Sequence, residues 1–165
     1  MALKDAFIGE LKYEGSLTRK MLERVPLDKK DWRPHEKSMA LGRLATHVAE
    51  IPHWISRIIT VDDWDFAVRG FSSHTASTST ELVNIFEEKL AQAIVDLEAM
   101  KDEDFNKTWI VRKGDQMRNE LVKKVAIRGW GFSHLIHHRG QLSVYLRLLD
   151  VPVPGMYGPS ADEKT

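Results

Sequence analysis

Histidines are the residues of this chain whose type and spacing could do chemistry, because it contains seven of them and no cysteine. Three fall within five residues, His134, His137 and His138, in the segment FSHLIHHRGQLSVYLR, which is otherwise rich in aliphatic and aromatic residues. An imidazole can carry a proton near neutral pH or bind a divalent metal ion through a ring nitrogen. The segment therefore suggests metal binding or acid–base chemistry, depending on which rings point inward.

A helical segment would turn two of these three rings inward. With about 100° per residue, His138 lies about 40° from His134, inside an apolar stripe. Their i, i+4 spacing lets two imidazoles reach one ion from adjacent turns. His137 lies at the edge of the stripe and its role stays open, whereas Arg139 falls on the opposite, outer side.

A third inward histidine comes from an earlier helical segment. His47 lies in the middle of an apolar face, His53 falls on the polar side, and Pro52 is expected to kink the helix. Burying imidazoles beside aliphatic residues costs free energy unless their nitrogens have partners, and one divalent ion would satisfy three nitrogens, from His47, His134 and His138. Alternatively, all three are hydrogen-bonded core histidines without an ion.

Three polar residues lie on or near the same helical faces. Glu50 lies near the edge of the His47 face, and Gln141 and Tyr145 share the stripe of His134. They could orient an imidazole or a ligand. Alternatively, Glu50 is a solvated carboxylate, and the other two lie at the edge of the core with satisfied polar tips. The sequence identifies no catalytic residue.

Four long amphipathic helices are expected to carry these residues. Their predicted ranges are about 3–25, 39–60, 79–100 and 119–149. Residues 61–78 are expected to be irregular, and residues 108–117 to form a short extended excursion that turns at Lys113-Gly114-Asp115. The prediction is an all-α fold: a four-helix bundle of long antiparallel-packed helices with a long crossover connection, forming a single domain over residues 1–165.

Composition excludes several other classes of function. Lys plus Arg and Asp plus Glu number 24 each, and the pI is about 7.1, so the surplus of positive charge that nucleic-acid binding needs is missing. No run of about 18 apolar residues could span a membrane, and the N-terminus has no apolar signal core. Without cysteine there are no disulfides or thiolate metal sites. We expect a cytoplasmic protein that binds neither nucleic acid nor membrane.

Two blocks of the sequence resemble a known family. The segment HLIHHRGQ, from His134 to Gln141, with the following YLR and PGMYGPSAD, resembles the C-terminal signature of the DinB/YfiT-like superfamily. The block SMALGRLATHVAE, preceded by WRP, is similar to its second-helix motif. The resemblance spans nearly the whole chain. It implies a four-helix bundle, often a homodimer, in which His47, His134 and His138 hold zinc, nickel or a related ion.

The resemblance also suggests a reaction. Characterised relatives include thiol S-transferases and isomerases that use low-molecular-weight thiols. Three imidazoles leave a coordination position open, where zinc can lower the pKa of bound water or of a thiol. We therefore predict a metal-dependent enzyme with a small-molecule substrate, a thiol S-transferase that uses a low-molecular-weight thiol. A metal-dependent hydrolase and a non-catalytic bundle with a structural metal are the alternatives. Metal loss is expected below about pH 6, where free imidazole is protonated.

Overall fold

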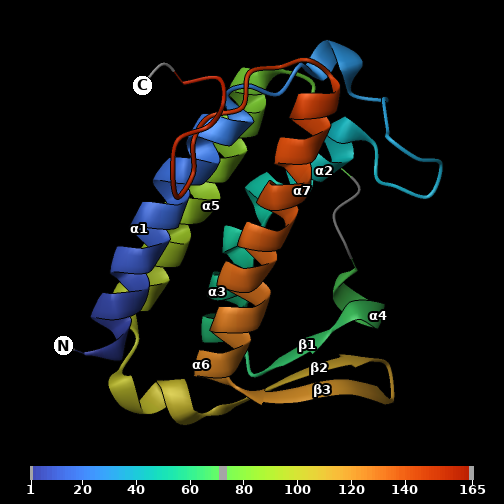
Figure 1. Ribbon diagram of the computed structural model, residues 1–165. Coiled ribbons are helices and arrows are strands. Elements are labelled where there is room, and N and C mark those ends of the chain that lie inside the picture. The colour runs from blue at the N-terminus through green and yellow to red at the C-terminus, as the bar shows by residue number, and fades with distance from the viewer. Residues whose placement is uncertain (1, 71–73, 164–165) are drawn as a thin grey trace.

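Helices make up most of the protein, and a small sheet lies at one end of them (Figure 1). The structure is a computed structural model that describes residues 2–70 and 74–163. The elements are, in chain order, α1 (Leu3–Leu22), η1 (Leu27–Lys29), α2 (Leu41–Glu50), α3 (Pro52–Thr60), β1 (Asp63–Asp65), α4 (Phe66–Arg69), α5 (Ser79–Ala99), η2 (Asp102–Asn106), β2 (Thr108–Lys113), β3 (Gln116–Val122), α6 (Lys123–Ala126), η3 (Ile127–Ser133) and α7 (His134–Leu148).

The prediction of an all-α four-helix bundle is wrong. The described chain forms more than four helices and a three-stranded mixed sheet, in which β2 pairs in parallel with β1 and antiparallel with β3. The extended excursion at 108–117 is confirmed, with its turn at Gly114, whose φ of 59° is readily adopted only without a Cβ. The sheet continues further because residues 119–122, predicted to begin the fourth helix, pair with β2 instead.

The predicted second helix is divided at Pro52. α2 ends at Glu50 and α3 begins at Pro52, where a residue without an N–H is tolerated because the first turn of a helix has no partner for it. The region 61–78, predicted to be irregular, contains β1 and α4; its residues 71–73 lie outside the described part of the chain.

The helices α1 and α5 follow the predicted apolar repeats and lie side by side (Figure 1). Phe7 and Leu11 of α1 and Leu82, Phe86 and Leu97 of α5 are buried. Their spacings of four residues and, from Phe86 to Leu97, eleven residues place them on one face of each helix, and this face packs into the core.

The segments α6, η3 and α7 run without a break from Lys123 to Leu148, and η3 is a π-helix. Gly131 of η3 lies against α3, where an added Cβ would come within 2.6 Å of Ile55 Cγ1. Glycine thus permits η3 to approach α3 closely, just before the chain reaches His134. Pairing of η3 with α3 and of α7 with α2 fixes the last helical segment against the one that carries His47.

The core consists of two clusters of buried side chains, one around Leu44, Val48 and Leu142 and the other around Trp54 and Phe132. His47 precedes Val48 of the first cluster and His134 follows Phe132 of the second, so the candidate site lies near the junction of the two clusters.

One outward prediction is wrong: Arg139 is buried, with a side chain only 3% exposed. Its Nη2 donates to Glu14 Oε2 of α1 at 2.6 Å, and the hydroxyl of Tyr157, in the C-terminal tail, is 2.9 Å from both Glu14 carboxylate oxygens. The helical wheel failed here because the tail folds back beside α1 and helps to cover this side of α7 (Figure 1).

Candidate metal centre

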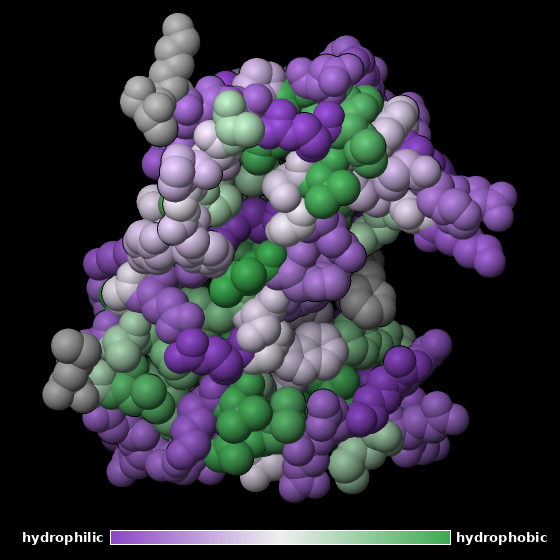
Figure 2. Space-filling view, in the orientation of Figure 1, coloured by the Kyte–Doolittle hydropathy of each residue, from purple (hydrophilic) through white to green (hydrophobic). Residues whose placement is uncertain are grey.

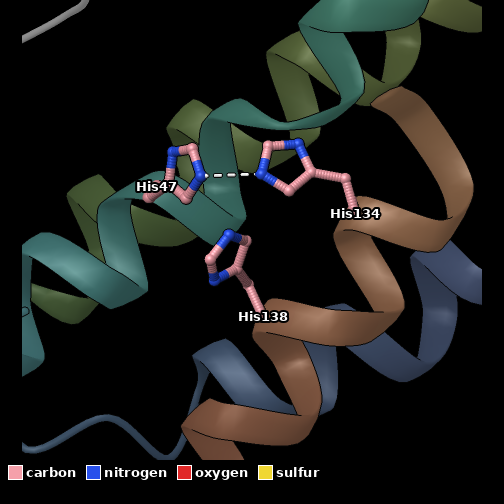
Figure 3. Close-up of side chains that lie close together, drawn as sticks. All are labelled: His47, His134 and His138. Carbon is pink, nitrogen blue, oxygen red and sulfur yellow. Dashed lines mark hydrogen bonds between the residues drawn. The ribbon is translucent and has the colours of Figure 1, made fainter. Parts of the chain in front are cut away.

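Three histidines from two helices point at one shared space (Figure 3). His47 comes from α2, and His134 and His138 from successive turns of α7; one ligand nitrogen of each lies within 4.8 Å of the others. The Nε2 atoms of His47 and His134 are 3.1 Å apart. Nitrogens bound to one tetrahedral zinc ion at about 2.0–2.1 Å would be about 3.3 Å apart. The His47–His134 pair is already close to this spacing, and all three nitrogens lie within 4.8 Å of one another.

Hydrogen bonds to the far side of two rings set which nitrogen can bind a metal. His138 Nδ1 lies 2.7 Å from Gln141 Oε1, and His134 Nδ1 lies 3.3 Å from the carbonyl oxygen of Trp130. Both oxygens are acceptors, so each Nδ1 carries the proton and leaves Nε2 free as a ligand. The amide of Gln141 is also 3.1 Å from His137 Nε2, to which it donates. The exposed His137 thus helps to hold Gln141 against His138.

The surroundings keep these rings neutral, the form that binds metal. Burial, and then the nearby His134 and His138, lower the pKa of His47 to about 3. Burial first, and His138 second, lower the pKa of His134 to about 4. Burial also lowers the pKa of His138, although the hydrogen bond that its ring donates to Gln141 acts in the opposite direction. At neutral pH all three rings are therefore unprotonated and can act as metal ligands.

These shifts change the expected pH dependence of metal binding. Protons compete for His47 and His134 of the folded protein only well below the ordinary histidine pKa of about 6.5, so metal loss moves below the pH of about 6 expected for free imidazole. We expect zinc occupancy to stay nearly full at about pH 5 and to fall towards pH 4. Elemental analysis after equilibrium dialysis at several pH values measures this occupancy.

The same shifts require a control for folding. As the pH falls below about 6.5 the unfolded chain binds more protons at these histidines than the folded chain does, so the metal-free fold loses stability. Circular dichroism at each pH therefore has to accompany the dialysis. Zinc loss between pH 7 and 6 from a protein that is still folded would contradict the prediction.

The other predicted residues lie around the cluster in different roles. Glu50 pairs with Arg43 at 3.2 Å, and no hydrogen bond joins it to a histidine within the described chain. Tyr145 donates its hydroxyl proton to the carbonyl of Met39 at 3.2 Å and packs edge-on against Trp32, so it supports the core.

Two hollows border the histidines. The cationic pocket, about 270 Å³ in volume, is lined by Arg43, His47, Glu50, His53, Trp54, Arg57 and Lys89. The apolar groove, about 550 Å³, is lined by Asn119, Leu121, Val125, Gly129, Trp130, Ser133, His134 and His137. Hydrophobic side chains gather over α6 on the face seen in Figure 2. A ligand can therefore approach the cluster from a polar side or from an apolar side.

Sequence reasoning missed the cations of the cationic pocket. A signal for two of them exists, because a helical wheel places Arg43 and Arg57 within about 40° of one another, on the flank of His47 that also carries Glu50. Lys89 comes from α5, which only the fold brings next to α3.

Comparisons with known proteins agree with this architecture. The family model described as "DinB family" matches residues 3–165. The uncharacterized protein YrdA of Bacillus subtilis (strain 168) is 26% identical over 162 residues, which cover 96% of this chain and 90% of that protein.

Two crystal structures share the fold. A DinB-like protein from Bacillus cereus ATCC 10987 aligns with a TM-score of 0.72 at 19% identity, over 93% of this chain and 97% of that one. The DinB-like protein YjoA of Bacillus subtilis aligns with a TM-score of 0.68 at 16% identity, over 96% and 98%. Within the described residues, none of the helices has the length and apolar character needed to cross a membrane. Because the family model covers nearly the whole sequence, the chain belongs to the DinB family.

Proposed function

We propose that this protein is a metal-dependent thiol S-transferase, which joins a low-molecular-weight thiol to a small electrophile. The observation that carries the proposal is the cluster of three neutral imidazoles, which would hold a divalent ion through His47, His134 and His138. Three protein ligands leave a coordination position for a reactant. Imidazole suits zinc and nickel alike, so the donor set is compatible with either ion.

The residues around the cluster support this chemistry in separate ways. A bound ion would supply a Lewis acid that lowers the pKa of a thiol, giving thiolate at neutral pH. Gln141 and the Trp130 carbonyl hold two rings in the tautomer that binds metal. The apolar groove beside His134 offers space for the apolar body of an electrophile.

One feature favours a thiol over water as the nucleophile. Hydrolysis benefits from a general base that takes the proton of the attacking water. Glu50 is the carboxylate that lines the pocket beside His47, and it is engaged by Arg43 at 3.2 Å. A thiol has a much lower pKa than water, so it can lose its proton to the solvent once the ion assists, without a carboxylate base.

The test is a conjugation assay with defined reactants. Zinc-loaded, nickel-loaded and metal-free protein would be mixed with 1-chloro-2,4-dinitrobenzene and with cysteine, glutathione or N-acetylcysteine, and the thioether followed by absorbance. We expect metal-dependent conjugation with at least one thiol, lost in His134→Ala. If no thiol reacts in a metal-dependent way, the proposal fails. Metal-dependent hydrolysis of p-nitrophenyl acetate would then point to a hydrolase, and tight metal binding without either reaction to a structural ion.

A further inference from the structure

Arg57 is a cation that lies over two aromatic rings and forms no ion pair with a carboxylate of the described residues. Its guanidinium carbon lies 4.6 Å from the ring centroid of Trp54 and 4.3 Å from that of Trp64. The side chain is half-buried, and burial lowers the pKa of Arg57. Nε is enclosed without a hydrogen-bond partner, and neither terminal nitrogen makes a hydrogen bond or ion pair to any residue in 2–70 or 74–163. Stacking positions the guanidinium on the rings, but within the described residues no carboxylate is in direct contact with its charge.

The charges that line the cationic pocket do not balance. Arg43, Arg57 and Lys89 contribute three positive charges and Glu50 one negative charge. Glu50 is paired with Arg43 and also attracts Arg57 through space, so its single negative charge is shared between two arginines. Lys89 pairs at 2.8 Å with Glu88, whose side chain is 73% exposed and does not line the pocket. The pocket therefore has a positive surplus, and a divalent ion held by neutral histidines would increase it.

The positive charge of the cationic pocket lies beside one of the candidate metal ligands. His47 and Arg57 line the same pocket, and its volume of about 270 Å³ is enough for a small organic anion. A molecule bound at Arg57 would thus extend towards the metal centre. A planar guanidinium matches a carboxylate, with which it can form two parallel hydrogen bonds.

We propose that the cationic pocket binds a carboxylate carried by one of the two reactants, with Arg57 as its anchor. The inference rests on the proposed function only in treating the anchored molecule as a reactant; the carboxylate site itself does not depend on turnover. Either the thiol or the electrophile can carry the carboxylate. In both cases the anchor places the rest of the molecule beside His47, which favours small carboxylates over neutral analogues.

Binding of matched probes tests the site. Isothermal titration calorimetry would compare 3-mercaptopropionate with its amide, and 3,5-dinitrobenzoate with its amide, on zinc-loaded and metal-free protein. We expect at least one carboxylate to bind more tightly than its amide in both forms of the protein. Arg57→Gln should weaken that carboxylate at least about tenfold and leave its amide unchanged, because only the carboxylate uses both guanidinium hydrogen bonds. The thiol pair and the dinitrophenyl pair identify which reactant carries the group.

Controls separate the anchor from general effects. Arg128 also stacks on aromatic rings, Phe7 and Phe132, but lies outside the pocket. Arg128→Gln should therefore leave the affinities for the carboxylates and for their amides unchanged. Zinc affinity should be the same in wild type and Arg57→Gln. If the glutamine variant does not fold, Arg57→Lys is used instead. It keeps the positive charge but cannot form two parallel hydrogen bonds, so the affinity for the carboxylate should still fall at least about threefold.

Two results would overturn the inference. One is affinity for both carboxylates within twofold of wild type in a folded Arg57 variant. The other is a carboxylate preference that disappears when the metal is removed, since the ion itself would then be the anchor. A protein that binds a carboxylate through Arg57 but conjugates no thiol would support this site and refute the proposed reaction.

Discussion

Zinc affinity is expected to fall at least about 100-fold in His47→Ala, whereas His53→Ala should leave it within about twofold of wild type. His47 Nε2 lies 3.1 Å from His134 Nε2, so its removal leaves two ligands from a single helix. His53 lies six residues further on and lines the cationic pocket without joining the cluster. Competition with a chromophoric chelator at pH 7.5 measures both affinities.

The matched controls for this prediction are two other histidines, His53 on α3, which follows the helix of His47, and His137 on α7. His53 is half-buried like His47, so a general effect of removing a buried ring would appear in both variants. His137→Ala removes the exposed neighbour of His138, which contacts the cluster through Gln141, and should cost far less than His47→Ala. Similar losses in the His47 and His53 variants would show that the three-histidine cluster is not the zinc site.

Local periodicity explains why the cluster could be predicted. An advance of about 100° per residue is a property of any α-helix, so the spacing alone turned His134 and His138 to one face and His47 to the buried face of another helix. The structure brings these three rings together, which the sequence could not show, because the distance between two helices depends on all the packing between them.

Non-local pairing explains most of what the sequence missed. Residues 119–122 were assigned to a helix because they adjoin a long helical pattern, yet they pair with residues 108–111 of β2. β1 is three residues long and exists only because it lies beside β2. The sequence also did not reveal the π-helix η3. A helical wheel built on 3.6 residues per turn does not describe its residues, which directly precede His134.

The buried pair Arg139–Glu14 leads to a large expected loss of stability. Arg139→Met should lower the free energy of unfolding by about 3–5 kcal/mol, because it leaves the Glu14 carboxylate buried without its cation. The two side chains are only 3% and 6% exposed, and Arg139 also donates to the Thr18 hydroxyl at 2.9 Å. Urea unfolding of the metal-free wild type and of the metal-free Arg139→Met variant, at the same pH, measures the loss.

A double variant distinguishes loss of the pair from loss of packing. In Glu14→Leu/Arg139→Met neither charge remains, so we expect it to recover a large part of the stability lost in Arg139→Met. The control Arg147→Met removes an arginine of the same helix whose pair with Asp162 is half exposed, and should cost less than about 1 kcal/mol. If the double variant is as unstable as the sum of the single ones, the packing of the side chains, rather than the stranded charge, accounts for the loss. Recovery with unchanged zinc affinity would show that the stranded Glu14 charge caused the loss, and that α7 presents His134 and His138 to His47 independently of the contacts of Arg139 with Glu14 and Tyr157.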